Sequence, residues 1–239
     1  MSEAPEASFV SHLIELRDRL IRSLLAIGLV FIALCIYPGP GHIYDLLALP
    51  LTQALPQGTK MLAIGVVTPF MVPIKVTSMV AFVIALPYVL YQVWSFVAPG
   101  LYAHEKRLGL PLLIASTLLF LLGMAFCYFL VFGQAFKFIA SFAPKSITAA
   151  PDIESYLSFV LTMFSAFGLA FEVPVVLVVL VRLGIVSVEK LRQWRSYFVV
   201  IAFVIAAVVT PPDVVSQLAL GIPMCLLYEI GILCARMVA

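Results

Sequence analysis

The sequence predicts an all-α, polytopic integral membrane protein with six transmembrane helices, both termini on one side and a short last pair of spans. The chain has 239 residues, of which 64% are hydrophobic and only 11% charged, and its mean hydropathy is +1.16. A soluble domain is about half apolar and about a quarter charged, so a soluble core could not bury this excess. The bases gather in particular loops between apolar runs, and we expect residues 1–239 to form a single transmembrane domain.

The N-terminal stretch has a helical pattern that leads directly into the first span, expected at residues 20–37. Apolar side chains repeat at spacings of four, three and four: Phe9, Leu13, Leu16 and Leu20. Glu15, Arg19 and Arg22 share another face, which is typical of an interfacial helix. The apolar run lacks a small-residue cleavage pattern, so we expect a retained span and not a cleaved signal peptide.

Residues 38–67 are apolar but are broken by several prolines and glycines, Pro50 among them. A loop of about 30 residues without structure is uncommon in compact domains. We therefore expect this segment to fold onto the membrane face as a cap.

The middle of the chain holds three longer spans, expected at residues 68–98, 108–136 and 156–181. Pro87 lies inside the first of them, where it removes a backbone hydrogen bond and should kink the helix. Glu172 lies near the middle of the last one, where an ionisable side chain costs at least about 2.5 kcal/mol and indicates function. Its partner could be a polar group on another helix, a water-filled cavity or a second protein. Alternatively, Glu172 is protonated and hydrogen-bonded inside the bundle.

The last two spans are expected at residues 197–210 and 214–235. The first has only about 14 residues, or about 21 Å of helix, whereas the hydrocarbon core is about 30 Å thick. Asp213 should cap the second helix, and Pro223 should break it. A hairpin with such a short arm should thin the bilayer or lie beside a partner.

Lysine and arginine are distributed unevenly over the two sides that six spans create. One side holds Arg17, Arg19, Arg22, Lys106, Arg107, Arg182, Lys190, Arg192, Arg195 and Arg236. The other holds Lys60, Lys75, Lys137 and Lys145. The positive-inside rule therefore puts both termini in the cytoplasm, together with the polar turn at residues 96–107.

Two carboxylates, Glu15 and Glu105, then lie at the cytoplasmic face on different elements. Partly desolvated, they could hold two guanidinium groups, because contacts between arginine and a carboxylate are often bidentate. The alternative is ordinary surface pairing, of Glu15 with Arg19 and of Glu105 with Lys106 or Arg107, worth under about 1 kcal/mol.

Catalysis, metal binding and cofactors find no support in the motifs. There is no nucleophile motif, phosphate-binding glycine loop or pair of zinc-ligand histidines, and the four cysteines lie in apolar runs. No basic patch is free of membrane context, so nucleic acid is not expected as a partner. An aromatic belt is expected at the cytoplasmic boundary: Tyr91, Trp94, Trp194 and Tyr197.

Five motifs in order along the chain resemble those of a known family. They are HLIELRDR at 12–19, QVWSFVAPGL at 92–101, SYLSF at 155–159, FEVP at 171–174 and TPPD at 210–213. The chain thereby resembles the multi-spanning receptor subunit, or C subunit, of the twin-arginine protein translocase.

The resemblance implies a receptor and assembly core in the cell inner (cytoplasmic) membrane, without enzyme activity, cofactor or metal. Such a protein binds the twin-arginine signal peptides of folded precursor proteins, which are exported with the proton-motive force. The implied partners are the single-span translocase subunits A and B and the lipid bilayer. A homo-oligomer within a larger complex is also expected.

The resemblance also implies roles for particular residues. Those associated with signal-peptide binding are Glu15, Glu105, Arg17, Phe96 and Pro99. Those associated with partner docking or intramembrane polarity are Glu172, Tyr197, Val204, Thr210 and Asp213. Structural roles are expected for Pro50 and Pro87.

Two other function classes stay open. Glu172 and Pro87 would also suit a secondary transporter or proton channel, although no internal repeat is visible, which counts against the inverted-repeat transporters. A purely structural scaffold is the third class, and it would not distinguish arginine from lysine in a signal peptide.

Overall fold

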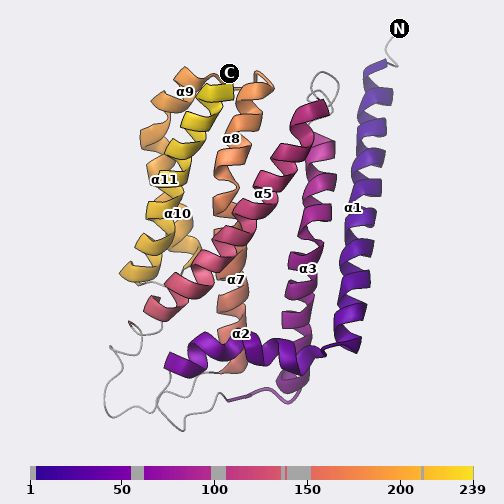
Figure 1. The fold of residues 1–239 in the computed structure, drawn as a ribbon, viewed down its shortest axis with the longest axis vertical. Helices are drawn as coiled ribbons and strands as arrows, with labels where there is room; N and C mark the ends of the chain where they lie inside the picture. Colours follow the sequence, from indigo (N-terminus) through magenta and orange to yellow (C-terminus); the bar gives the residue numbers. More distant parts are fainter. Residues whose placement is uncertain are drawn as a thin grey trace.

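The computed structural model describes residues 4–54, 62–97, 106–135, 138, 152–210 and 213–238. Figure 1 shows upright helices beside one another, with α2 crossing one end of the bundle and α5 tilted across it. The elements are α1 (Ala4–Ile36), α2 (Pro40–Ala54), α3 (Thr68–Val97), α5 (Lys106–Phe126), η1 (Cys127–Val131), α7 (Ile153–Phe171), α8 (Val173–Arg182), α9 (Val188–Gln193), α10 (Arg195–Val209) and α11 (Val214–Val238). Apart from one isolated bridge between Leu62 and Asp152, these described residues contain no β-structure, and the all-α prediction is confirmed for them.

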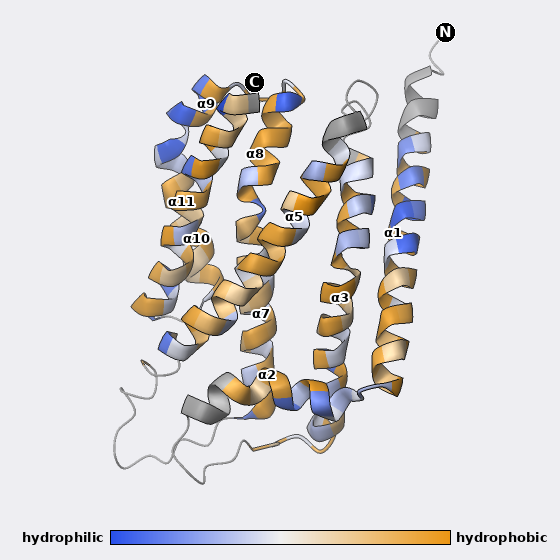
Figure 2. Cartoon of the chain, viewed as in Figure 1, coloured by the Kyte–Doolittle hydropathy of each residue, from blue (hydrophilic) through white to orange (hydrophobic). Residues whose placement is uncertain are grey.

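Five helical stretches are long and apolar enough to cross a membrane. They are Val10–Ile36, Thr68–Phe96, Gly109–Ala135, Ile153–Arg182 and Val214–Met237. The helix α10 is apolar but has only 15 residues. Hydrophobic residues run along the upright helices, and the hydrophilic ones concentrate near one end of α1, α3 and α9 (Figure 2). The fold is therefore that of a multi-pass membrane protein.

The N-terminal helix α1 joins the predicted interfacial stretch and the first span in one unbroken element. It ends before Gly39, whose φ of +94° lies in a region that favours glycine and lets the chain turn sharply into α2. Ile43 of α2 packs with Val76 of α3 and Leu157 of α7. The helix α2, which includes Pro50, thus packs against the bundle, and the expectation that residues 38–67 form a cap on the membrane face stays a prediction.

Pro223 affects its helix less than predicted. Pro87 lies within α3 and Pro223 within α11, and each helix continues through its proline. The prediction that Pro223 breaks the last span is therefore wrong. Proline is tolerated in membrane helices because neighbouring helices and local adjustments satisfy the freed backbone groups. The kink at Pro87 stays a prediction.

A one-residue irregularity lies within the long stretch Ile153–Arg182, which the sequence predicted as one span at residues 156–181. It separates α7 from α8 at Glu172, whose N–H donates to Leu169 O at 3.1 Å and whose carbonyl accepts from Val176 N at 3.0 Å. Pro174 lies in the first turn of α8, where its missing N–H does no harm. Glu172 thus stands at a helix junction and not in mid-helix.

The helices α5 and α7 cross closely at two glycines. A Cβ on Gly168 would lie 2.5 Å from the ring of Phe120, and a Cβ on Gly123 would lie 2.5 Å from Phe167 O. Small residues of this kind let membrane helices approach closely and gain van der Waals contact. The main core cluster around this crossing includes Phe164 and Phe167.

Candidate functional site

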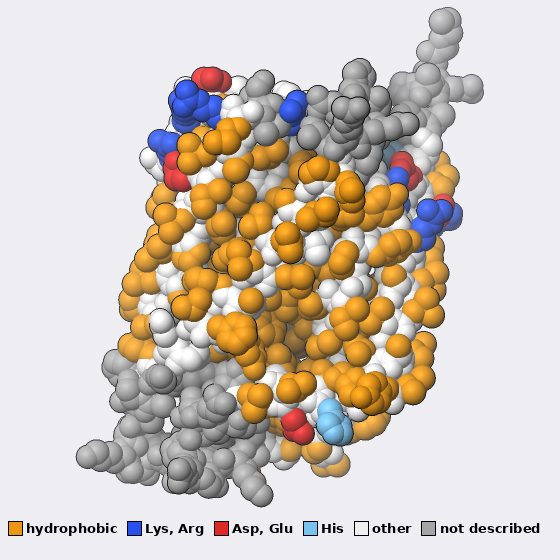
Figure 3. Space-filling model, viewed as in Figure 1, with side chains coloured by type: hydrophobic (Ala, Val, Ile, Leu, Met, Phe, Trp, Pro, Cys, Tyr) orange, Lys and Arg blue, Asp and Glu red, His pale blue; other side chains and the backbone are white. Residues whose placement is uncertain are grey.

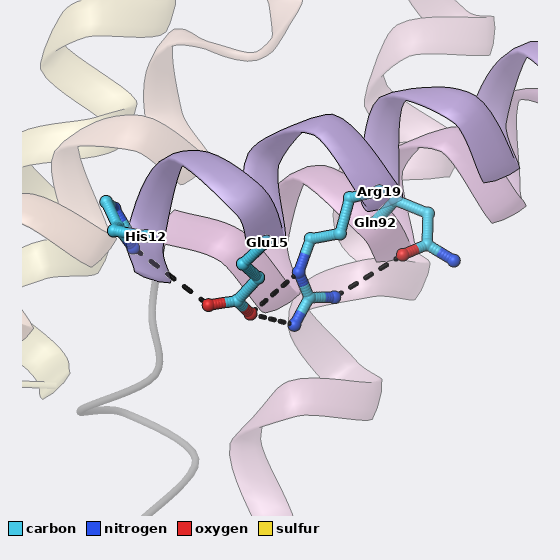
Figure 4. A network of polar contacts seen from close by, with 4 residues as sticks. All are labelled: His12, Glu15, Arg19 and Gln92. Atoms are coloured by element: carbon cyan, nitrogen blue, oxygen red, sulfur yellow. Dashed lines mark hydrogen bonds and ion pairs between the residues drawn. The ribbon is translucent and has the colours of Figure 1, made fainter. Parts of the chain in front are cut away.

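The two stretches that the sequence singled out, at the start of the chain and at the end of the second span, lie together in the structure. The contacts join α1 to α3, and Figure 4 shows four of the side chains. Five residues make these contacts, and we call them the α1–α3 patch: His12, Glu15, Arg19, Gln92 and Phe96.

Glu15 is the centre of this patch. The Nε and Nη2 atoms of Arg19 donate to Glu15 Oε1 at 2.9 and 2.5 Å, and Arg19 Nη1 donates to Gln92 Oε1 at 3.4 Å. His12 Nδ1 lies 3.9 Å from Glu15 Oε2, and the His12 ring stacks on Phe96 with centroids 4.3 Å apart. The pairing of Glu15 with Arg19 is the surface alternative that the sequence allowed.

The patch is open enough to exchange partners. The side chain of Glu15 is 41% exposed and that of Arg19 is 23% exposed. Ion pairs with this accessibility contribute little, because water and salt screen them and ordering the side chains costs entropy. An incoming guanidinium could therefore replace Arg19 or bind the Oε2 atom, which Arg19 does not contact.

The other predicted signal-peptide residues have different positions. Arg17 is exposed, and its guanidinium pairs at 2.8 Å with Asp18, which is not one of the five residues of the patch. Pro99 and Glu105 lie outside the described residues, so the pairing of Glu15 with Glu105 stays a prediction.

Glu172 lies in a buried polar chain that the sequence did not predict. Trp94 Nε1 donates to Ser116 Oγ at 3.0 Å, and Ser116 Oγ donates to Glu172 Oε2. All three residues are buried, and Glu172 Oε1 has no hydrogen-bond partner among the described residues. The partner of the carboxyl is thus a polar group on another helix, Ser116 of α5, which is one of the alternatives left open above.

Trp94 corrects one sequence-based prediction. We expected it in an aromatic belt, but it is only 7% exposed and packs against Val175 and Val179 of α8. Burial of the indole is possible because Ser116 accepts its N–H, which a belt position would have left to water.

The predicted partner-docking residues lie along the last hairpin. Tyr197 and Val204 project outward from α10, with exposed fractions of 70% and 57%. Thr210 is buried at the C-terminal end of α10 and its Oγ1 donates to Ala206 O at 2.8 Å. Asp213 Oδ1 accepts from Ser216 N at 2.7 Å, so its predicted capping role at α11 is confirmed.

Sequence reasoning missed Ser116 and Gln92. Gln92 precedes Phe96 by four residues, a spacing that places both on one helix face. From this spacing, Gln92 could have been predicted to lie beside Phe96 in the site. A serine in the apolar run that faces Glu172 is a weaker signal, because nothing in the sequence says which spans are neighbours.

Comparison with known proteins identifies the family. The family described as Sec-independent protein translocase protein (TatC) matches residues 11–223. The TatC protein of Haemophilus influenzae is 48% identical over 237 residues, covering 99% of this chain and 92% of its own length. The TatC protein of Escherichia coli (strain K12) is 50% identical over 236 residues, covering 99% and 91%.

Solved structures agree with this result. A crystal structure of the twin-arginine translocase receptor TatC is 41% identical, with a TM-score of 0.80, covering 95% of this chain and 99% of its own. A second structure of that receptor, in the detergent DDM, is 42% identical with a TM-score of 0.81, covering 93% and 98%. The chain belongs to the TatC family of Sec-independent protein translocase proteins.

Proposed function

We propose that this translocase subunit is the receptor that binds twin-arginine signal peptides at the cytoplasmic face, through Glu15 of the α1–α3 patch together with Glu105. It acts in the cell inner membrane, without enzyme activity of its own, and recruits the single-span subunits A and B. Folded precursor proteins are then exported with the proton-motive force. The single observation that carries this proposal is the accessible Glu15 carboxylate, held by an exchangeable arginine.

Six spans with both termini in the cytoplasm are supported by the arrangement of the helices. The helix α1 begins and α11 ends at the same end of the bundle, and α10 leads from α9 at that end to the start of α11 at the other (Figure 1). Most of the Lys and Arg residues in the described part of the chain belong to the elements at the first end: Arg17, Arg19, Arg22, Arg182, Lys190, Arg192, Arg195 and Arg236. Hydrophobic side chains cover the band between the ends (Figure 3).

Recognition of the arginine pair follows from the chemistry of Glu15. In the structure, the Glu15 carboxylate already accepts two N–H groups from one planar guanidinium, that of Arg19. A lysine ammonium lacks this planar fork. A site in which an arginine of the signal peptide replaces Arg19 at Glu15 would therefore favour arginine over lysine. A second acid, Glu105, would extend this preference to two adjacent arginines.

Recruitment of single-span partners is supported by α10. At 15 residues it is about 22 Å long, shorter than a hydrocarbon core of about 30 Å. Its outward face carries Tyr197 and Val204, which a partner helix could cover. Covering this face would also relieve the mismatch between the short helix and the bilayer.

The test compares crosslinking of an Arg-Arg and a Lys-Lys signal peptide to the full-length protein in membranes. We expect Glu15→Gln with Glu105→Gln to remove the Arg-Arg crosslink while membrane insertion is unchanged. The matched control is Glu189→Gln, which removes a carboxylate from α9. Undiminished, arginine-selective crosslinking in the double variant would contradict the proposal.

A further inference from the structure

The buried chain Trp94–Ser116–Glu172 joins three helices in a fixed order. Trp94 comes from α3, Ser116 from α5, and Glu172 from the junction of α7 and α8. Ser116 is fully buried, and the other two residues are each 7% exposed. Water therefore has little access, and the hydrogen bonds of this chain depend on the protein groups.

The direction of each hydrogen bond follows from the chemistry of the groups. The indole N–H can only donate, so Ser116 Oγ must act as its acceptor. The hydroxyl of Ser116 has a single proton, which then points to Glu172 Oε2. Trp94 thus orients the hydroxyl, and the hydroxyl fixes one oxygen of the carboxyl. The second oxygen, Oε1, stays without a partner among the described residues.

The same helical turn of α3 also forms the α1–α3 patch. Gln92 and Phe96 are four residues apart and make the contacts to α1. Trp94 lies midway between them, about 200° around the helix from Gln92, and therefore faces away from α1 toward α5. A shift of this turn would change both the patch and the hydrogen bond to Ser116.

We propose that Trp94 and Ser116 are positioning residues for Glu172, and that they couple its carboxyl to occupancy of the α1–α3 patch. The coupling half rests on the proposed signal-peptide site. Binding of an arginine pair at Glu15 displaces Arg19, which also releases Gln92. The α3 turn then shifts, and the Trp94–Ser116 hydrogen bond changes with it.

Fluorescence gives a direct test, because the chain has two tryptophans, Trp94 and Trp194. In Trp194→Phe, Trp94 is the only indole. We expect Ser116→Ala to shift its emission to the blue, since the N–H loses its acceptor. Ser116→Thr, which keeps the hydroxyl, should restore the parent spectrum. An unchanged spectrum in Ser116→Ala would overturn the hydrogen bond itself.

The second measurement adds a signal peptide to the Trp194→Phe protein. An Arg-Arg peptide should shift the Trp94 emission, and a Lys-Lys peptide should not. In Ser116→Ala the Arg-Arg peptide should still crosslink at Glu15 but should no longer shift the emission. Crosslinking with no emission change in the parent would overturn the coupling and leave the proposed function intact. Failure of the peptide to crosslink would instead overturn the proposed site.

The third measurement asks whether the chain matters for export. Hydrogen bonds to a carboxylate are strong enough that losing one should reduce precursor export about tenfold in Ser116→Ala. Ser116→Thr should restore export, and Trp94→Phe should behave like Ser116→Ala while retaining peptide crosslinking. If both loss variants export normally at equal protein levels, the positioning role is wrong.

Discussion

The imidazole ring of His12 stacks on the ring of Phe96, with centroids 4.3 Å apart and planes inclined by 15°. This contact fixes the start of α1 against the last turn of α3. It also holds His12 Nδ1 within 3.9 Å of Glu15 Oε2, so the stack orients one side of the candidate carboxylate. Phe96 therefore acts on the patch through the contact of its ring with His12.

Replacing the Phe96 ring should weaken signal-peptide binding. Aromatic pairs contribute about 0.5–1.5 kcal/mol beyond area burial, so Phe96→Leu should lower peptide affinity about two- to tenfold. Phe96→Tyr keeps the stacking surface and should bind nearly as the parent does. Titration of a labelled Arg-Arg peptide into the detergent-solubilised protein measures this. Equal loss in both variants would show that the stack is not the cause.

If the arginine pair binds at Glu15 as proposed, removing Arg19 should strengthen its binding, because Arg19 occupies Glu15 Oε1 in the structure. An accessible pair of this kind is worth up to about 1 kcal/mol, so we expect a gain of up to about fivefold in Arg19→Gln. Arg22→Gln removes the same charge from an exposed position three residues further along α1 and serves as the control. A loss of binding confined to Arg19→Gln would mean that Arg19 holds Glu15 in place.

Much of the fold could be predicted because lipid imposes a simple rule on apolar runs. The five long helical stretches coincide with the long apolar runs of the sequence. The predictions failed at local events that depend on neighbours. Pro223 does not break α11, whereas the helix is interrupted at Glu172, two residues before Pro174 and where the carboxyl is hydrogen-bonded to Ser116.

The site could be predicted only in part. The sequence selected the stretches that contain Glu15 and Phe96, and the structure brings them together through α1 and α3. The link from Trp94 through Ser116 depends on the tilt of α5 across the bundle, which no periodicity in the sequence reveals.

The close crossing of α5 and α7 predicts that Gly168 cannot be enlarged. A Cβ there would lie 2.5 Å from the Phe120 ring, and overpacking of this kind costs about 1–3 kcal/mol. Gly168→Ala should therefore lower the melting temperature, by about 2–4 °C for each kcal/mol. Gly28→Ala is the control, because a Cβ at Gly28 meets nothing within 4 Å. Equal melting temperatures in both variants would contradict the close crossing.

Asp152 should make stability depend on pH. Hydrogen bonds from the Ser155 N–H and hydroxyl, at 3.0 and 2.9 Å, hold the pKa of its carboxyl below the usual range. Because the folded pKa is depressed, the stabilisation is present above the unfolded pKa of about 3.9 and is lost as pH falls through the folded value.

The measurement compares melting temperatures of the parent and Asp152→Ser, which keeps a capping oxygen that does not titrate. The advantage of the parent should shrink as pH falls from about 6 to about 3. Asp45→Ser, in α2, controls for loss of a carboxylate elsewhere. A parent advantage that is constant over this range would show that Asp152 does not cause the dependence.

Variants of Asp213 can distinguish a structural role, capping of α11, from a requirement for its negative charge. Its Oδ1 accepts from Ser216 N at 2.7 Å at the start of α11, and its Oδ2 has no partner among the described residues. Loss of a cap costs about 1 kcal/mol, so Asp213→Ala should lower both the melting temperature and precursor export. Asparagine and serine also cap helices, and Asp213→Asn and Asp213→Ser should keep both properties if capping is the whole role. If Asp213→Asn melts as the parent does but fails to export, the negative charge itself is required, and Oδ2 becomes the atom that a partner subunit would contact.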